Sequence, residues 1–542
     1  MAGTRLQIVG AFVLFTLLAA PVAWHLTQVE RVDLPVDRIQ QLSWAASRFS
    51  GPEKFQVDIY SLSSVSSSAP PSSASNVAYL MHNLQLNAEQ KSSLQTAMRT
   101  GLQATDEALE TLKADHVRFS VFLLCDENAA VSTPALTVGK YRHAWSSQCQ
   151  VNKGDAVHFA IERLVQRHVY PQKSIMQNTG TKPARKALRY RLQFSLLKEN
   201  PTTPWNEDLR TLVDQYLSRF VHKVGALANF TIETQMVQYA RLAREVTSSA
   251  IRKEFYINAD DLKHFKSAND FLDASVLDDG EQVLHFMAAL PDIKHAPLYI
   301  RAAENDASLA TSFELPGWGI AAILNPFALN GKPSADVSAE ETATTKTREL
   351  QRVMGLFVTE FRALLGVPSF TKRQREEDRT SHGTAEQRLL FLPSPVDGIA
   401  DWELDVIARD RFSKLMQTAI ETLQSTVELV EALPELSVLE RVQTRVESAV
   451  TRLEAILCGS AREQECVEVS DLRSLLAMAR QASELTDAAY YDHTMIRQLY
   501  FPQEQMLGVY APLLAPLILP FVLGLVRELK RFKMKRAATG KV

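Results

Sequence analysis

Residues 188–197 read LRYRLQFSLL, and polar and apolar side chains alternate along most of this stretch. Alternation with a period of two is typical of a β-strand, because successive side chains point to opposite faces of a sheet. The flanking residues 156–169 and 207–227 carry apolar side chains at helical spacing instead. A strand between two amphipathic helices predicts an α/β layer.

The same pattern extends through residues 27–400. A helix is predicted at 88–112, and further strands are predicted at 55–62, 117–124, 230–237, 299–302 and 319–324. Three stretches lack periodic apolar residues, and they predict a disordered Ser/Pro-rich loop at 63–75, a surface loop at 331–346 and a polar insertion at 368–388. We therefore predict an α/β region over 27–400.

Residues 401–500 are predicted to be helical. From Trp402 onward the apolar spacing is helical with few breaks, and one face carries Val442, Val446, Val450, Leu453 and Leu457. A stripe of this kind forms the core of its own domain more often than it forms an interface with another subunit. The sequence therefore predicts packed helical hairpins in this region.

Residues 506–526 contain no charged side chain, and a basic cluster begins at Arg527. At about 1.5 Å per helical residue, this stretch matches the roughly 30 Å hydrocarbon layer of a bilayer. A signal for attaching a glycosylphosphatidylinositol (GPI) anchor also ends in an apolar tail, but that tail is normally the last part of the chain. We therefore predict a transmembrane helix at 506–526, followed by a basic cytosolic tail at 527–542.

Residues 8–24, IVGAFVLFTLLAAPVAW, form a second apolar run. A retained transmembrane helix at 8–26, after a short cytosolic segment at 1–7, is favoured. A cleaved signal peptide is the alternative, because small residues end the run, although Pro21 disfavours cleavage directly after Ala20. Both interpretations place the middle of the chain in the lumen of the endoplasmic reticulum. The predicted fold is an α/β lumenal domain with a helical C-terminal half, flanked by two transmembrane helices with both termini cytosolic.

Glycosylation and disulfide bonds would agree with that compartment. Asn229-Phe230-Thr231 is an acceptor sequence for N-glycosylation, whereas Asn200-Pro201-Thr202 has proline at the middle position and is predicted to be silent. The four cysteines predict two local disulfides. The predicted pairs are Cys458 with Cys466 and Cys125 with Cys149. Four buried thiols remain the alternative.

Composition and motifs exclude several classes of function. The chain has 542 residues, 46% of them hydrophobic, which is enough for two modules or one large one, and its net charge of -3 gives no general attraction to nucleic acid. The sequence contains no HExxH, CxxC, Walker A or GxSxG motif, and the histidines are scattered. The SxxK match at 369–372 lies in a charged stretch and is attributed to chance. No catalytic, cofactor-binding or metal site is predicted.

Three prolines recur every four residues in the last apolar stretch: Pro512, Pro516 and Pro520. They lie on one stripe of a helix, and each removes a backbone donor. A kinked anchor is one interpretation, since neighbouring groups can satisfy the freed carbonyls. Our hypothesis is that this stripe packs against helices of another subunit.

Six short motifs occur in order along the chain: LQFSLL at 192–197, NFT at 229–231, HAPLYI at 295–300, PGWG at 316–319, WELD at 402–405 and LYFP at 499–502. In these motifs the chain resembles the PIG-S family of GPI transamidase subunits over nearly its whole length. The resemblance is weakest at 50–150 and in the polar stretches at 331–346 and 368–388.

This resemblance implies a non-catalytic subunit of a membrane enzyme in the endoplasmic reticulum, which attaches GPI anchors to the C-terminus of proproteins. It implies partners of the PIG-K, PIG-T, PIG-U and Gaa types together with membrane lipid, catalysis in PIG-K, and no cofactor. The one site it transfers is the acceptor Asn229. The alternative from another class is a membrane-anchored lumenal hydrolase with an unrecognised active site, which would turn over substrate alone.

Overall fold

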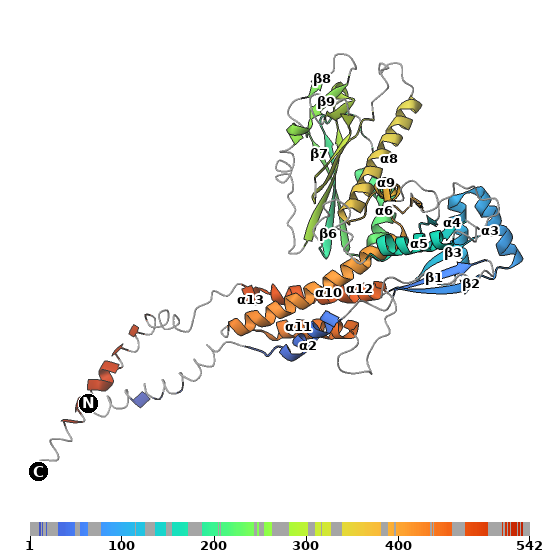
Figure 1. The fold of residues 1–542 in the computed structure, drawn as a ribbon. Helices are drawn as coiled ribbons and strands as arrows, with labels where there is room; N and C mark the ends of the chain where they lie inside the picture. Colours follow the sequence, from blue (N-terminus) through green and yellow to red (C-terminus); the bar gives the residue numbers. More distant parts are fainter. Residues whose placement is uncertain are drawn as a thin grey trace, which may run out of the picture. The chain divides into compact units, whose positions relative to one another are not determined.

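A computed structural model of the chain divides into two compact units, which are described separately (Figure 1). Unit 1 comprises Met1–Phe49, Leu415–Val467 and Gln481–Val542, and unit 2 comprises Ser50–Lys414 and Glu468–Arg480. The residues described by the structure are 10–11, 14, 18, 31–48, 55–62, 77–113, 115–124, 136–147, 154–171, 187–203, 205, 207–242, 246–248, 254–262, 281–301, 309–315, 317–326, 339–380, 388–394, 397–433, 436, 438–457, 472–496, 512, 515–516, 519–520, 522–527, 529–531 and 533–534.

The predicted strand at 188–197 is β6, an inner strand of a five-stranded sheet in unit 2. The sheet order is β13 (Ser312–Leu315), β14 (Gly319–Ile323), β10 (Glu281–Leu290), β6 (Arg189–Lys198) and β7 (Asn229–Gln238). β14, β10, β6 and β7 run parallel, and β13 is antiparallel to β14. Strand β6 pairs along its whole length with both neighbours, which explains why it is buried from Leu192 to Lys198.

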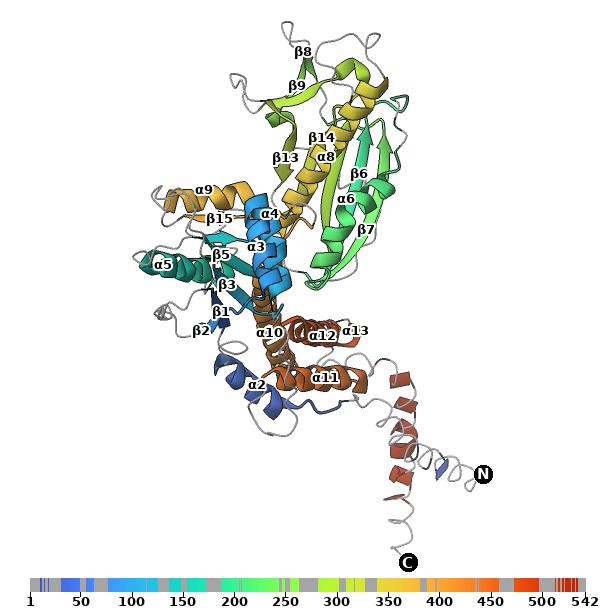
Figure 2. The ribbon, with the colours of Figure 1, turned by 90° about the vertical axis from the view of Figure 1, so that its right-hand side faces the viewer.

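Two helices, α6 (Leu209–Val224) and α8 (Ala339–Leu364), lie along one face of this sheet (Figures 1 and 2). The Asp208 carboxylate accepts a hydrogen bond from the Thr211 backbone N–H at 3.1 Å and so caps the start of α6. Aromatic side chains fill the layer between helices and sheet. Phe194 stacks on Phe286 with ring centroids 4.9 Å apart, and Phe361 of α8 meets Phe286 at 5.7 Å.

A six-stranded sheet forms the second layered part of unit 2. Its order is β15 (Leu389–Phe391), β4 (Leu136–Val138), β5 (His143–Ser146), β3 (Phe119–Leu123), β1 (Phe55–Ser61) and β2 (Val77–Asn83). Its helices are α3 (Ala88–Thr100), α4 (Leu102–Leu112) and α5 (Gly154–Leu164), and α5 continues into a π-helical turn at Val165–Val169. Gly101, with φ of 145°, separates α3 from α4. The single predicted helix at 88–112 is therefore two helices.

Unit 2 also contains a small four-stranded sheet. Its order is β12 (Leu309–Ala310), β11 (Leu298–Arg301), β9 (Phe255–Asn258) and β8 (Thr247–Ser248), and 3₁₀ turns occur at Ala259–Leu262 and Ile293–His295. Ile257 and Ile300 of this sheet share a core with Leu197, Ala289 and Ile323, near the carboxyl ends of the large parallel strands. In α/β proteins that end of a sheet often binds ligands, but here the protein's own side chains cover it.

Unit 1 is helical. It contains α2 (Val36–Arg48), α11 (Glu440–Leu457), α13 (His493–Ile496) and the later parts of α10 (Asp401–Ala432) and α12 (Leu472–Tyr490). Arg38 of α2 donates to Glu454 of α11 at 2.7 Å. All five residues of the apolar stripe predicted at 442–457 are buried on α11, so the interpretation of the stripe as core is confirmed.

The prediction of flanking transmembrane helices at 8–26 and 506–526 is corrected by the structure. Among the described residues, no helix has both the length and the apolar character needed to cross a bilayer. Within these segments the longest described piece is 522–526. The other residues of these segments, apart from 10–11, 14, 18, 512, 515–516 and 519–520, lie outside the described residues.

Two further expectations change. Residues 368–388 are not a polar insertion throughout, because α9 (Phe370–Thr380) forms there and buries Arg373 and Glu377. Helix α8 begins at Ala339, inside the predicted surface loop. The predicted loop at 63–75 lies outside the described residues.

Candidate functional site

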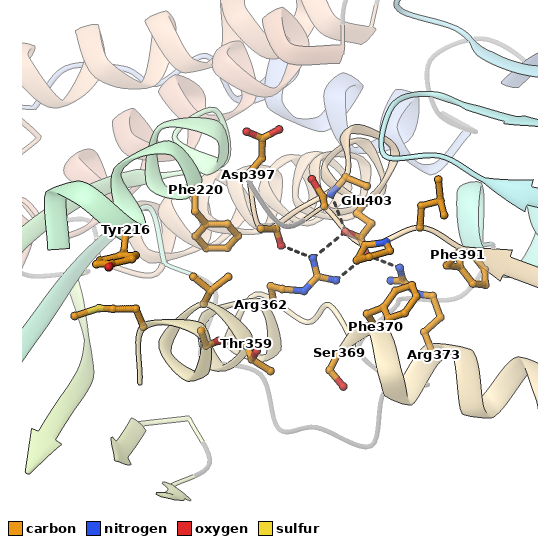
Figure 3. A pocket seen from close by; sticks show the side chains of 18 of the residues that line it. Tyr216, Phe220, Thr359, Arg362, Ser369, Phe370, Arg373, Phe391, Asp397 and Glu403 are labelled. Carbon is orange, nitrogen blue, oxygen red and sulfur yellow. Dashed lines mark hydrogen bonds and ion pairs between the residues drawn. The ribbon is translucent and has the colours of Figure 1, made fainter. Parts of the chain in front are cut away.

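A cavity of about 330 Å³ lies in unit 2 beside α6, α8, α9 and the start of α10 (Figure 3). Ligand sites in proteins typically enclose about 300–1,000 Å³. The apolar part of the wall comes mainly from Tyr216, Phe220, Met354, Val358 and Phe370. Charged groups lie at two places in the wall, around Glu403 and at Asp397. The cavity is thus the size of a small-ligand site and combines an apolar wall with fixed charges.

The start of α10 positions Glu403. The Glu403 carboxylate accepts a hydrogen bond from the Ala400 backbone N–H at 2.9 Å, three residues earlier. This contact is typical of the first turn of a helix, where backbone N–H groups have no helical partner and a glutamate side chain at the third position can accept from one of them. The carboxylate is therefore fixed by its own helix before any partner from another element binds it.

Two arginines from other helices converge on the same carboxylate. Arg362, near the end of α8, donates to Glu403 at 2.8 and 3.0 Å and also to the Gly398 carbonyl at 2.6 Å. Arg373 of α9 donates to Glu403 as well. Burial on its own would raise the pKa of Glu403, but the charges of Arg362 and Arg373 hold it at about 2. Glu403 is therefore a permanent anion near neutral pH.

Helix α9 begins where the SxxK match was found. The Ser369 hydroxyl accepts from the Lys372 backbone N–H at 3.4 Å, and the Ser369 carbonyl accepts from the Arg373 N–H at 3.0 Å. Ser369 thus starts α9 and sets the direction of Arg373, which is a structural use of the residue.

The second charged group of the cavity wall, Asp397, is more open to solvent, with its side chain 38% exposed. Lys223 of α6 lies 3.3 Å from the Asp397 carboxylate and 2.8 Å from that of Asp401. Gly398, beside Asp397, has a φ of 72°, and a Cβ there would come within 2.8 Å of Phe220 and Val358. A glycine is therefore required at this turn for the backbone to pass so close to α6 and α8.

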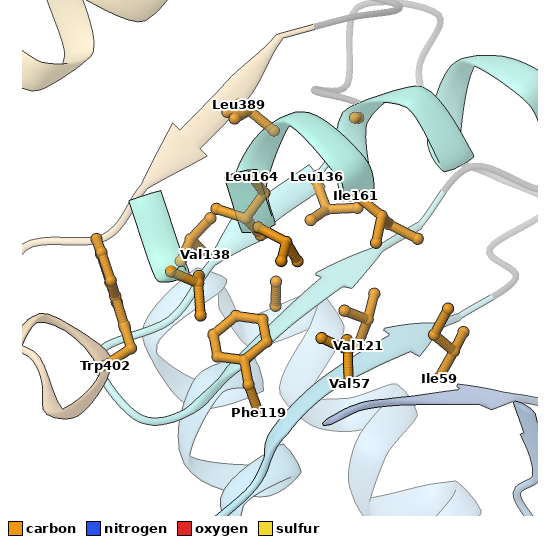
Figure 4. Close-up of a cluster of buried hydrophobic side chains, with 14 of the residues drawn as sticks. Val57, Ile59, Phe119, Val121, Leu136, Val138, Ile161, Leu164, Leu389 and Trp402 are labelled. Atoms are coloured by element: carbon orange, nitrogen blue, oxygen red, sulfur yellow. The ribbon is translucent and has the colours of Figure 1, made fainter. Parts of the chain in front are cut away.

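The WELD motif at 402–405 joins this site to the six-stranded sheet. The Trp402 indole donates to the Gly139 carbonyl at 3.1 Å, and its ring lies beside the buried side chains of that sheet (Figure 4). Asp405 accepts a hydrogen bond from Arg142 at 2.8 Å. Each polar member of the motif therefore has a partner distant in sequence.

A second buried cluster surrounds His143 of β5. Its Nε2 lies 3.0 Å from Asp106 and its Nδ1 lies 3.4 Å from Glu110, while Ser120 is its register partner on β3. Serine, histidine and aspartate are also the residues of hydrolase triads. Here His143 is 0% exposed and both Asp106 and Ser120 are 1% exposed, so no substrate can reach them in this structure.

Asn229, the predicted acceptor for N-glycosylation, is exposed at the first residue of β7. Its Oδ1 accepts from Arg480 at 2.6 Å, and Thr231 of the same sequon is also exposed. Glycosylation itself stays a prediction.

Among the residues that the structure covers, no group of three or more His, Cys, Asp or Glu side chains could hold a metal ion.

The other predicted sites have different outcomes. Pro512, Pro516 and Pro520 are helical and exposed, and their contact with another subunit stays a prediction. The four cysteines of the predicted disulfides lie outside the described residues: Cys125, Cys149, Cys458 and Cys466.

The sequence did not predict the cluster of Arg362, Arg373 and Glu403. Glu403 was visible within WELD, and an acid three residues into a predicted helix is a known start signal. Its two arginine partners could not be found in this way, because no local pattern marks Arg362 as a partner of Glu403 and Arg373 lies in the stretch predicted to be a polar insertion.

Comparison with known proteins agrees with the motifs. The bovine protein named GPI-anchor transamidase component PIGS is 26% identical over 337 residues, which cover 61% of this chain and 55% of that protein. The human protein of the same name is 24% identical over 349 residues, covering 64% and 58%. The fission yeast GPI transamidase component PIG-S homolog is 22% identical over 343 residues, covering 63% and 54%. The matched part of the chain spans just over half the length of these relatives.

The family profile of PIG-S, described as phosphatidylinositol-glycan biosynthesis class S protein, matches residues 10–535. That match includes both layered sheets, the cavity and the helical unit. The chain therefore belongs to the PIG-S family.

Proposed function

We propose that this chain is a component of a GPI transamidase in the membrane of the endoplasmic reticulum. The observation that carries the proposal is the match to the PIG-S family over residues 10–535. The names of the mammalian and fission yeast relatives, all GPI transamidase components, support the same role. In that role the chain supports attachment of GPI anchors to the C-terminus of proproteins.

The contribution of this chain is non-catalytic, and catalysis belongs to a PIG-K subunit. Burial of the cluster of Ser120, His143 and Asp106 supports this assignment, because a hydrolytic site needs a nucleophile that meets its substrate. The Arg362–Glu403–Arg373 cluster also supports it. Both arginines neutralise an ionised carboxylate, so that carboxylate is a poor general base near neutral pH.

The partners are subunits of the PIG-K, PIG-T, PIG-U and Gaa types. A chain with two compact units offers separate surfaces to several partners. The exposed prolines Pro512, Pro516 and Pro520 form one of these surfaces. Replacing all three with leucine is expected to reduce co-purification with the other subunits in detergent, and unchanged co-purification would exclude the stripe as a contact.

Genetic complementation tests the proposed function. Cells of the source species that lack the gene are expected to lose a GPI-anchored reporter from their surface, and the intact chain is expected to restore it. Two variants are compared at matched expression levels, Glu403→Gln and Glu376→Gln. Each removes one carboxylate charge, but Glu376 is exposed, whereas Glu403 is buried with its arginine partners, so a loss seen only with Glu403→Gln indicates damage to the fold. Normal surface display of the reporter in the deleted cells would contradict the proposal.

A further inference from the structure

Charge is distributed unevenly along the cavity next to Glu403 (Figure 3). At its buried end two arginines face one carboxylate, and the side chains of Arg362, Arg373 and Glu403 are only 11%, 9% and 4% exposed. This end therefore carries one positive charge in excess. The compensating negative charge belongs to a neighbouring, more exposed group, where Lys223 lies close to the carboxylates of Asp397 and Asp401 and the Asp397 side chain is 38% exposed. Water screens the exposed Asp397 carboxylate far more effectively than the buried groups.

Of the two arginines, Arg373 makes fewer hydrogen bonds than Arg362. Its flat faces are covered by aromatic rings, with the guanidinium carbon 4.8 Å from the Trp402 ring centre and 5.5 Å from that of Phe391. A guanidinium has five N–H donors that point outward in its plane. Among the described residues, this guanidinium donates one hydrogen bond, to Glu403. Arg373 as a whole is 7% exposed. Arg373 lines the cavity, so the N–H donors that Glu403 does not bind are available to an anion there.

A second polar group in the same wall also lacks a partner. The Ser394 hydroxyl is buried and makes no hydrogen bond within the described residues. A hydroxyl can donate to an anion without adding charge of its own. The wall beyond these groups is apolar, formed by side chains of α6 and α8 such as Phe220, Met354 and Val358. An occupant therefore needs one acidic group and an apolar body.

We propose that this cavity binds a monoanionic carboxylate carried on an apolar group, with the carboxylate on the N–H donors of Arg373 that Glu403 does not bind and the apolar body against α6 and α8. A phosphate monoester fits less well, because it carries about 1.5 to 2 negative charges at neutral pH and the Asp397 carboxylate lines the same cavity. The inference goes beyond the proposed function and does not depend on it, since binding can be measured on the full chain alone.

Ligand-observed NMR on the purified full chain tests the proposal directly. N-acetylphenylalanine and octanoate represent two sources of a carboxylate, a polypeptide terminus and a fatty acid. Each is compared with its neutral amide, and phenyl phosphate is the dianionic comparison. At least one carboxylate is expected to bind about tenfold or more tightly than its amide and than phenyl phosphate, as one charge-assisted hydrogen bond in a buried site would require.

Three variants locate the binding. Arg373→Gln removes the charge but leaves Glu403 paired with Arg362. Gly355→Phe fills the cavity from α8, at a position where a Cβ meets nothing within 4 Å, so it keeps the backbone unstrained. Ser394→Ala removes the unpartnered hydroxyl. The first two are expected to abolish carboxylate binding, and the third is expected to weaken it.

Two control substitutions are matched to these variants. Thr347→Phe places the same ring at an exposed position of α8 outside the cavity, and Arg388→Gln removes an exposed guanidinium that pairs with Asp378. Both controls are expected to bind the carboxylate like the unmodified chain. The proposal would be overturned if carboxylate and amide bound equally or if phenyl phosphate bound more tightly than either. It would also be overturned if Arg373→Gln, or a folded Gly355→Phe protein, bound the carboxylate like the unmodified chain.

Discussion

Arg362 binds Glu403 through two hydrogen bonds, from Nη1 to Oε2 at 3.0 Å and from Nη2 to Oε1 at 2.8 Å. The pair joins the end of α8 to the first turn of α10, which are 41 positions apart in the sequence. Planar pairing of this kind fixes direction as well as distance, because both groups present two parallel partners. The orientation of the two helices at the cavity therefore depends on one carboxylate.

Removal of that carboxylate's charge is expected to destabilise unit 2. Glu403→Gln leaves two guanidinium groups, with side chains only 11% and 9% exposed, without a counter-ion, and breaking a buried pair costs about 3–5 kcal/mol. The free energy of unfolding, measured with urea and tryptophan fluorescence, is expected to fall by this amount. The control Glu376→Gln changes an exposed glutamate on the neighbouring α9 and is expected to stay within about 0.5 kcal/mol. Equal effects of both would exclude a structural role for the cluster.

The buried carboxyl group of Glu360 on α8 is expected to make the stability of the chain depend on pH. Burial, with the nearby charge of Glu314, raises the pKa of Glu360 from 4.5 to about 8. The folded state therefore keeps this proton after the unfolded state has lost it, so stability falls as the pH rises from about 4.5 to about 8, by about 1.4 kcal/mol per pH unit from this group.

The Glu360→Gln variant tests this dependence, because its side chain stays neutral at every pH. Its advantage in free energy of unfolding over the unmodified chain is expected to grow between pH 5 and pH 8, the range set by the two pKa values. Glu376→Gln is expected to give a constant difference over the same range. A difference for Glu360→Gln that does not change with pH would show that this carboxyl group is not protonated in the folded state.

Two glycines predict opposite effects of the same substitution. Gly355 lies within α8 with open space around it, so Gly355→Ala is expected to stabilise the chain by about 0.5–1 kcal/mol through helix propensity. Gly319 has a φ of 148°, and a Cβ there would lie 1.9 Å from the His285 carbonyl oxygen on the neighbouring strand. Gly319→Ala is expected to cost more than about 2 kcal/mol. Thermal unfolding distinguishes the two, and equal shifts would contradict the close packing of β14 on β10.

The sequon at Asn229 predicts a single glycan when the chain is made in the secretory pathway. Both Asn229 and Thr231 are exposed at the start of β7. Asn229→Gln and Thr231→Ala are each expected to remove the mobility shift seen on treatment with an N-glycosidase. Asn200→Gln is the matched control, because the proline after Asn200 blocks acceptance. A shift that persists in Asn229→Gln would place the glycan elsewhere.

The parallel strands show what the sequence could and could not predict. β6 and β7 agree with prediction because polar and apolar residues alternate along part of each. β10 was missed although it pairs with β6 over ten residues. Its last seven residues are buried, so no alternation marks them, and a continuous apolar run does not distinguish a strand from a helix.

The cavity was missed for a different reason. Helix α9 is dense in charge, which predicts a solvated segment, yet Arg373 and Glu377 are buried because their partners come from other elements. Glu377 meets His168, 209 positions earlier in the chain, at 2.7 Å. Burial of this kind depends on pairing between distant residues, and no local pattern encodes it.

Affinity purification with mass spectrometry tests the central claim most directly. The tagged full chain, expressed at its native level and extracted in mild detergent, is expected to co-purify with subunits of the PIG-K, PIG-T, PIG-U and Gaa types. A tagged unrelated membrane protein of the endoplasmic reticulum serves as the control. Recovery of the chain without a PIG-K subunit, under conditions in which the other subunits stay together, would contradict its assignment as a component of the GPI transamidase.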